Sequence, residues 1–448
     1  MKNPLDGPLS GKKILFATSQ AIDTINPLTS LARYLQFAGC DVRWYAPAKL
    51  RHSLEKVEIH HYPFIHAKDL YLSDKLPFVP ERTLLTDPNE RLNHDLTNYF
   101  IKRVPEYFID ISDIYKNFRF NALICDSFFP AIPFVRYKMN VPVVAVGVVP
   151  LAEESADLAP YGSGLPPALH PSERLAYASM RQELYSETYQ ESIGLYSSML
   201  DGNDIVHKRS TLPDTLIRQA SLYLQVGPAS FEYPRGDFGT NIQFIGGLYP
   251  PSVPGYMPHW YDTRIDRYKT VILVTQGCRE TDPAKLLIPT LENFKNSTDT
   301  LIIATTGGHN TTALREQYSA DNIIIEDFIP FDDVMRHADV FVTNGGYGGV
   351  LYSLKYGVPV VAAGTEDQRN EVSARIEYFE CGIDLRVEHP TAKGLQLAID
   401  AVLNTDLYHT NVQQYSEDLK TYDAFALCRG HLSRLLRLEE TAAIINRR

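Results

Sequence analysis

Short apolar runs alternate with helix-length segments along most of this 448-residue chain, and this alternation limits the possible folds more than any other feature. Near the start, Ile14–Thr18 has the composition of a buried strand. Asn26 is expected to cap a helix whose first residue is Pro27, and Gly39 is placed to end that helix. Val42–Tyr45 then predicts a second strand. Such a strand–helix–strand unit builds a parallel sheet that is covered by helices.

The same alternation continues, and one segment recurs. Val141–Gly147 and Val358–Gly364 are almost identical. The match indicates either two domains of similar doubly wound architecture or a chance similarity between buried parallel strands. Further apolar runs with the length of a strand are Ala122–Cys125, Val143–Val146, Val271–Thr275, Leu301–Ala304, Ile323–Ile325, Val340–Thr343 and Val360–Ala363.

A segment rich in proline and glycine, residues 246–258, separates the two halves. We therefore predict an N-terminal domain over 1–245, a linker over 246–265 and a C-terminal domain over 266–448. The C-terminal helix is expected to pack back on the N-terminal domain. A second proline-rich stretch, Pro160–Pro171, predicts a long surface loop of the kind that contacts substrates.

The net charge of −11 and the absence of a Lys/Arg-rich run argue against binding to nucleic acid or to anionic membranes. No apolar stretch is long enough to span a membrane, and the first residues lack the apolar core of a signal peptide. The cysteines are scattered, odd in number and form no Cys-x-x-Cys pair, which favours a cytoplasmic protein without a structural zinc. The spacing of His52, His60, His61 and His66 fits no standard zinc motif, so we expect surface residues and no metal. The five cysteines are Cys40, Cys125, Cys278, Cys381 and Cys428.

The most specific motif is the glycine-rich segment Thr343–Val350, which follows a predicted strand and precedes a helical stretch, Leu351–Tyr356. Glycines at such a junction let the backbone approach a ligand, and the amides and dipole of the helix favour an anion. A tight turn without a ligand is the alternative. The segment is neither a P-loop nor a Gly-x-Gly-x-x-Gly fingerprint, so it predicts a phosphate or diphosphate site rather than an ATP or NAD site.

With these pieces together, the chain resembles the family-1 glycosyltransferases of the GT-B fold, the UDP-glycosyltransferase superfamily, and among them the microbial members that act on small molecules. The part that carries the resemblance best is Phe328-Ile329-Pro330 through Asn370. The resemblance implies an α/β protein with two doubly wound, Rossmann-like parallel-sheet domains that face a cleft.

The resemblance also implies a role for particular residues. Phe328 and Ile329 would contact the base, Asp367 and Gln368 would hold the sugar hydroxyls, and Gly277 with Cys278 would lie beside the diphosphate. The residues expected to contact the phosphates are Asn344, Gly346, Gly348, Gly349 and Val350. A nucleotide sugar, UDP-linked or dTDP-linked, would be a co-substrate, and no cofactor or metal is expected.

Two positions depart from the family pattern. The family usually has a phosphate-neutralising histidine where Asn344 stands, although some microbial members carry the same Thr-Asn-Gly-Gly sequence. More seriously, Thr24 occupies the position of the histidine that acts as general base, and a threonine hydroxyl is no base near neutral pH. Asp126, the expected partner of that histidine, is retained.

The implied function is inverting transfer of a sugar, with UDP-glucose as the first choice of donor, to a hydroxyl of a small apolar or phenolic natural product. Three routes for the proton stay open: Asp23 next to Thr24, Asp126 directly, or an acceptor acidic enough to need little help. Asp23 is favoured because it is adjacent to the missing histidine. The alternatives are a nucleotide-sugar-binding protein without transferase activity and a related enzyme with a different reaction.

Overall fold

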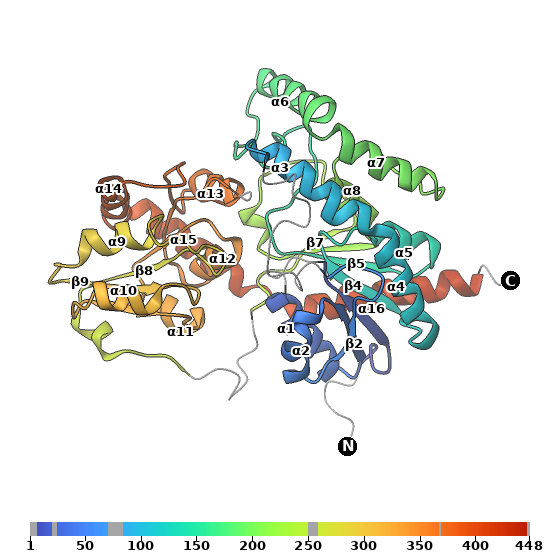
Figure 1. Cartoon of the computed structure of the whole chain (residues 1–448), viewed down its shortest axis with the longest axis horizontal. Coiled ribbons are helices and arrows are strands. Elements are labelled where there is room, and N and C mark those ends of the chain that lie inside the picture. Colours follow the sequence, from blue (N-terminus) through green and yellow to red (C-terminus); the bar gives the residue numbers. More distant parts are fainter. Residues whose placement is uncertain (1–6, 20–24, 70–83, 250–258, 367–368, 446–448) are drawn as a thin grey trace.

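The structure, a computed structural model, describes residues 7–19, 25–69, 84–249, 259–366 and 369–445. These residues form two entirely parallel sheets, one in each half of the chain. The first has seven strands in the order β3-β2-β1-β4-β5-β6-β7, and the second has six in the order β10-β9-β8-β11-β12-β13. The fold predicted from the sequence, two doubly wound α/β domains, is confirmed (Figure 1).

The strands of the first sheet are β1 (Lys13–Ala17), β2 (Asp41–Ala46), β3 (His60–Pro63), β4 (Ala122–Asp126), β5 (Val143–Gly147), β6 (Leu222–Gln225) and β7 (Ile242–Phe244). Those of the second sheet are β8 (Thr270–Thr275), β9 (Thr300–Thr305), β10 (Ile323–Glu326), β11 (Val340–Thr343), β12 (Val360–Ala362) and β13 (Gly382–Asp384). The strands β3, β6, β7 and β13 have no counterpart in the sequence prediction. β3, β7 and β13 are partly exposed edge strands, and the short β6 mixes leucines with Tyr223 and Gln225, so none of them is a continuous apolar run. Such short segments carry little periodicity.

The helices of the first half are α1 (Ile25–Phe37), α2 (Arg51–Lys56), α3 (Pro88–Asp95), α4 (Val104–Asn117), α5 (Ile132–Lys138), α6 (Pro171–Glu183), α7 (Gln190–Asp201) and α8 (Leu212–Gln219). Those of the second half are α9 (Leu287–Phe294), α10 (Thr311–Gln317), α11 (Phe331–Val334), α12 (Tyr347–Tyr356), α13 (Arg369–Tyr378), α14 (Ala392–Leu403), α15 (Asp406–Lys420) and α16 (Ala424–Ile445). The predicted start of the first helix, at Pro27 after an Asn26 cap, is two residues late, because α1 already begins at Ile25.

Both faces of each sheet are buried, which explains why the strands read as continuous apolar runs. Along β1, Ile14 and Phe16 pack into one hydrophobic cluster, and Leu15 and Ala17 pack into another on the opposite face. The cluster that holds Ile14 also contains residues of the second domain, Phe341 among them. One continuous apolar core therefore joins the two domains.

The near-identical segments of the sequence occupy equivalent places. β5 is the fifth strand from the β3 edge of the first sheet, and β12 is the fifth from the β10 edge of the second. Each lies beside a strand whose carboxyl end carries a candidate site residue: Asp126 is the last residue of β4, and Asn344 follows β11. The repeated sequence thus marks the same structural strand in two similarly wound domains.

The chain ends with α16, which leaves the second domain and runs along the first (Figure 1). The ring of Phe425 on α16 stacks on that of Tyr34 on α1, with centroids 5.1 Å apart. At the start of the linker region, Gly246 exchanges backbone hydrogen bonds with Gly227 of the first domain. Residues 250–258, the centre of the predicted linker, lie outside the described residues.

None of the helices in the described ranges has the length and hydropathy that crossing a bilayer requires. The expectation that the clustered histidines all lie on the surface holds less well. His61 is part of β3, and burial lowers its pKa although Nε2 contacts the Ala46 carbonyl at 2.9 Å. No grouping of three or more metal-binding side chains is found in the part of the chain that the structure describes.

Candidate active site

Several loops meet at the carboxyl edge of the second sheet, because parallel strands all end there. Nδ2 of Asn344, after β11, donates a hydrogen bond to the carbonyl of Gln276, after β8. A Cβ atom on Gly307, after β9, would lie 2.7 Å from Cα of Cys278. One on Gly364, after β12, would lie 2.3 Å from the Asn344 carbonyl oxygen. Glycine is therefore required at both positions for these loops to pack together.

The glycine-rich segment is divided between a turn and a helix. Gly345 has φ +87°, which glycine adopts without strain, and α12 begins two residues later at Tyr347. The sequence prediction that the helical stretch starts at Leu351 is therefore wrong, since Gly348 and Gly349 already lie in the first turn. The start of the helix could not be recognised in the sequence, because its first turn contains two glycines and glycine has a low helix propensity.

This first turn offers backbone donors that have no partner among the residues the structure describes. The first amides of a helix have no intrahelical acceptor. At the start of α12 these are the amides of Tyr347, Gly348 and Gly349, whereas the Val350 amide donates to the Gly346 carbonyl at 3.1 Å. Val350 is fully buried, so it supports the turn from below. A Cβ atom on Gly348 would meet nothing within 4 Å, which leaves open space beside the free amides.

The other phosphate-side residues lie next to this turn. Asn344 is 8% exposed, and one of its two amide hydrogens is directed at the Gln276 carbonyl, so it links two loops and keeps one donor. Gly277 has φ +75°, and its amide donates to Oγ1 of Thr275 at 3.2 Å. Cys278 is an exposed free thiol.

The two residues predicted at the base behave differently. Phe328 is 65% exposed, an unusual state for a large apolar side chain, and it lies 3.6 Å from where a Cβ of Gly308 would be. Ile329 is buried in the core that joins the domains. An exposed ring above a glycine has room to stack on a planar base, whereas Ile329 can offer only its backbone.

The predicted sugar-binding pair, Asp367 and Gln368, lies outside the described residues, but the segment before it is held firmly. Glu388 accepts hydrogen bonds from the amides of Thr365 at 2.8 Å and Glu366 at 3.2 Å, and it pairs with Lys285 at 2.8 Å. Burial would raise the pKa of the Glu388 carboxyl, but these bonds together lower it to about 2. Sequence inspection missed Glu388, because it is one of many acidic residues and its partners are distant in the chain.

On the first domain, Asp126 ends β4 and is fully buried. Oδ2 accepts the Ser19 amide at 2.6 Å, and Oδ1 accepts the Ser19 hydroxyl at 3.1 Å and the Phe128 amide at 2.9 Å. Burial outweighs these bonds and raises the pKa of Asp126 to about 6. Ser19 is the last described residue before Asp23 and Thr24, which lie outside the described residues. Asp126 therefore anchors the segment that leads to both.

The proline-rich loop of the first domain contacts the second domain directly. Oε1 of Glu371, on α13, accepts the amides of Gly162 at 2.8 Å and Gly164 at 3.0 Å. Nδ2 of Asn370 donates to the Gly162 carbonyl at 2.6 Å. Because α13 follows Gln368 at once, the helix next to the predicted sugar site also fixes the loop of the other domain. Nothing in the sequence pairs these segments, which are more than 200 residues apart.

A pocket lies between this loop and the helices of the first domain. It encloses about 880 Å³ of empty space, part of it open to solvent. Its walls are mainly apolar, from the segments around Leu92, Leu151, Leu158 and Leu184, and Glu371 and Arg375 of the second domain close one end. A concave site with largely apolar walls and a few polar groups is typical of small-molecule binding. The sequence pointed to the loop but not to α6 and the residues after it as the opposite wall.

The comparisons with known proteins agree with this architecture. Residues 197–420, half of the chain, match the family model described as UDP-glucoronosyl and UDP-glucosyl transferase. A 4'-demethylrebeccamycin synthase of Lentzea aerocolonigenes is 28% identical over 421 residues, which cover 92% of this chain and 97% of the relative. UDP-glucosyltransferase 1 of Beauveria bassiana is 26% identical, with 93% and 94% covered.

Among solved structures, the calicheamicin glycosyltransferase superposes with a TM-score of 0.72 at 16% identity, covering 95% of this chain and 98% of that one. The glycosyltransferase SnogD from Streptomyces nogalater gives 0.65 at 15% identity, covering 95% and 100%. These likenesses establish the two-domain fold. With a family model that matches half of its length, this chain belongs to the UDP-glucoronosyl and UDP-glucosyl transferase family and is a glycosyltransferase that uses a nucleotide sugar.

Proposed function

We propose that this enzyme transfers a hexosyl group, with inversion, from a uridine diphosphate sugar to a hydroxyl of a small apolar or phenolic acceptor. The observation that carries the proposal is the set of amides without intrahelical acceptors at the start of α12, with open space beside Gly348. The exposed ring of Phe328, in the loop that follows β10, supports it. UDP-glucose is the first choice of donor, because several relatives are named UDP-glucosyltransferases. A dTDP-sugar is the alternative, since structural neighbours were solved with thymidine diphosphate.

In the proposed reaction the acceptor oxygen attacks the anomeric carbon, and the bond from that carbon to the diphosphate oxygen breaks. Negative charge grows on the leaving diphosphate. In the proposal, the amides of Tyr347, Gly348 and Gly349, which have no intrahelical acceptor, stabilise this charge without having to reorient. Asp367 and Gln368 hold the sugar hydroxyls in the proposal, supported by the anchoring of Thr365 and Glu366 to Glu388.

We propose Asp23 as the acceptor of the proton that the nucleophilic hydroxyl loses, with Thr24 as a neighbouring polar residue. Two features of Asp126 favour a supporting role for it: its side chain is fully buried, and both its oxygens already accept hydrogen bonds from Ser19 and Phe128. General bases contribute typically 10²–10⁴-fold to a rate. An acidic phenol would need less of that contribution than an aliphatic alcohol.

The acceptor is proposed to bind in the pocket between the proline-rich loop and α6, because its walls are largely apolar and its end is closed by the helix that follows the sugar-binding pair. The net charge of −11 disfavours an anionic acceptor. All five cysteines are free, four of them buried, which suits action in a reducing cytoplasm.

The test measures release of the nucleoside diphosphate from UDP-glucose and from a dTDP-sugar, with and without a panel of phenols. Acceptor-dependent UDP release, a glycoside of inverted configuration and thermal stabilisation by UDP are expected. Asp23→Asn should lose most of the turnover and Asp126→Asn less; the reverse order would overturn the assignment of the base. Stabilisation by UDP without release of diphosphate for any acceptor would indicate a binding protein instead.

A further inference from the structure

The polar groups of the acceptor pocket differ in how well they are satisfied. Three glutamates line it: Glu153, Glu154 and Glu371. Glu153 pairs with Arg235 at 2.7 Å, and Glu371 pairs with Arg375 at 3.0 Å. Within the described part of the chain, Glu154 forms no ion pair within 4 Å, and Lys208 and Arg181 act on it from a greater distance. Glu154 is the pocket carboxylate that lacks a direct counter-ion.

The contacts of Glu154 are to neutral hydroxyls and involve one of its oxygens. Oε1 accepts the hydroxyl of Tyr185 and, at 3.5 Å, that of Thr211. Oε2 has no hydrogen-bond partner among the described residues, and it is not among the buried polar atoms, so it is accessible from the pocket. A carboxylate oxygen that is accessible within largely apolar walls is a binding point for a hydrogen-bond donor.

The cations near the pocket are already engaged. Arg181 donates to the carbonyls of Ser155 at 2.8 Å and Leu158 at 2.9 Å. Arg375 donates to Glu232 and to Glu371. Both guanidinium groups are therefore satisfied by other acceptors, and neither forms an ion pair with Glu154. Burial raises the pKa of the Glu154 carboxyl, and Lys208 and Arg181 lower it only from beyond ion-pair distance, so the carboxylate has no direct counter-ion in the pocket.

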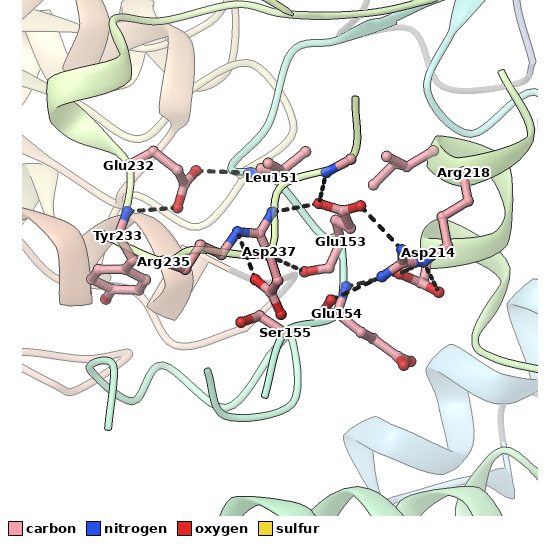
Figure 2. A network of polar contacts seen from close by, with 12 residues as sticks. Leu151, Glu153, Glu154, Ser155, Asp214, Arg218, Glu232, Tyr233, Arg235 and Asp237 are labelled. Carbon is pink, nitrogen blue, oxygen red and sulfur yellow. Dashed lines mark hydrogen bonds and ion pairs between the residues drawn. The ribbon is translucent and has the colours of Figure 1, made fainter. Parts of the chain in front are cut away.

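A rigid network keeps Glu154 in this position. The segment that carries it is fixed on both sides: the Leu151 amide donates to Glu232 at 3.2 Å, and the Glu154 amide donates to Asp214 at 2.8 Å. Arg218 joins Asp214 to the network at 2.9 Å. Figure 2 shows that the side chain of Glu154 points away from this network, while its backbone belongs to it. The carboxylate is thus held by its backbone and left free at its end.

We propose that Glu154, supported by Tyr185, makes this enzyme selective for acceptors that carry a protonated amine on an otherwise apolar body. The inference rests on the proposed function, since it names the class of molecule that the acceptor pocket takes. An ammonium group would supply the missing counter-ion, and charge-assisted hydrogen bonds are about twice as strong as neutral ones. The negative charge of the whole protein also attracts a cation rather than repelling it.

The test uses two probes of nearly the same shape, tyramine and 4-propylphenol, which differ in an ammonium against a methyl group. Their dissociation constants are measured by titration calorimetry or ligand-observed NMR at about pH 7.5, where an alkyl amine is protonated. Tyramine is expected to bind about tenfold more tightly than 4-propylphenol, as expected for one hydrogen bond to a charged group. Glu154→Gln should abolish the difference by weakening tyramine alone.

Two further variants sharpen the result. Glu183→Gln, at the end of α6, removes an exposed carboxylate that does not line the pocket and should leave the preference unchanged. Tyr185→Phe removes the partner of Oε1 and keeps the carboxylate, so the preference for tyramine should persist. Equal affinities for the two probes in the natural enzyme, or an unchanged preference in Glu154→Gln, would overturn the inference.

The outcome is distinguishable from failure of the transferase proposal, because it is read from binding. If UDP stabilises the protein and neither probe binds, the inference about the pocket is wrong while the donor site stands. If tyramine binds in a manner that depends on Glu154 but no acceptor releases diphosphate, the inference holds and the proposed transfer fails.

Discussion

Arg375 on α13 donates a hydrogen bond from Nη2 to Oε1 of Glu232 in the other domain at 2.6 Å, although 143 residues separate them in the chain. The two side chains are only 2% and 5% exposed. Arg375 also pairs with Glu371, and its guanidinium lies 4.2 Å from the centre of the Tyr233 ring. This buried cation joins α13 of the second domain to the pocket wall of the first domain, so the relative position of the proposed donor and acceptor sites depends on it.

Removal of this cation should destabilise the protein strongly. Arg375→Ala leaves the Glu232 and Glu371 carboxylates buried and unpaired, which costs about 3–5 kcal/mol. The measurement is the free energy of unfolding in urea. Arg386→Ala is the matched control, because its ion pair with Glu377 is largely exposed, at 72% and 47%, and is worth at most about 1 kcal/mol. Equal losses in the two variants would contradict the role assigned to the interdomain pair.

Neighbouring glycines in the first turn of α12 should respond in opposite ways. Gly348→Ala places a methyl group in open space, so stability should be unchanged or slightly higher, while a bound diphosphate would meet the methyl. UDP affinity, measured by calorimetry, should fall about tenfold or more. In Gly349→Ala the new Cβ would lie 3.2 Å from Cζ of Phe341, a buried ring, so stability should fall by about 1–3 kcal/mol. Unchanged UDP affinity in Gly348→Ala would remove the diphosphate from this turn.

The sequence predicted the strands that are buried on both faces, and the structure shows why. A strand such as β11 must be apolar at every position when helices cover both faces, and the prediction for Val340–Thr343 matches its bounds. The repeated segment in β5 and β12 was informative for the same reason, since both are interior strands at equivalent places. Edge strands such as β3, with exposed and half-buried residues, carry no such signal.

The candidate site divides along a similar line. The glycine motif was recognisable because a backbone conformation that needs glycine, such as the positive φ of Gly345, determines the residues of one short segment directly. Contacts between side chains far apart in the chain leave no local trace. Glu388, Glu371 and Arg375 look like ordinary charged residues until the fold brings their partners to them.

The anchoring of Thr365 and Glu366, before the proposed sugar-binding pair, gives a prediction about donor affinity. Glu388→Gln removes the charge that holds the Thr365 and Glu366 amides, so KM for the nucleotide sugar should rise several-fold. Glu280→Gln is the matched control, because Glu280 pairs with the same Lys285 at 2.8 Å but contacts neither of those amides. Steady-state kinetics with varied donor separates the two. A similar rise in both variants would mean that the ion pair with Lys285, rather than the loop, is responsible.

The lowered pKa of Glu388 also predicts how the free energy of unfolding changes at acidic pH. The folded-state pKa of Glu388, about 2, lies below its ordinary value of 4.5. Its contribution to the free energy of unfolding is therefore present above about pH 4.5 and is lost as the pH falls toward 2. Glu388→Gln should narrow the difference in stability between about pH 5 and pH 3. A variant that kept the full acid sensitivity would place the responsible carboxylates elsewhere.

Asp126 predicts the opposite dependence. Burial raises its folded-state pKa from 3.8 to about 6, so folding favours the protonated form. The stability linked to this group is fully present below about pH 3.8 and is lost as the pH rises through about 6. A pKa difference of this size between the folded and unfolded states corresponds to roughly 3 kcal/mol of stability. The measurement is the free energy of unfolding of the natural protein minus that of Asp126→Asn, followed from about pH 4 to pH 7.5. This difference should fall across that window, because the variant cannot ionise at this position. A difference that stays flat would show that the hydrogen bonds from Ser19 and Phe128 fully compensate the buried charge.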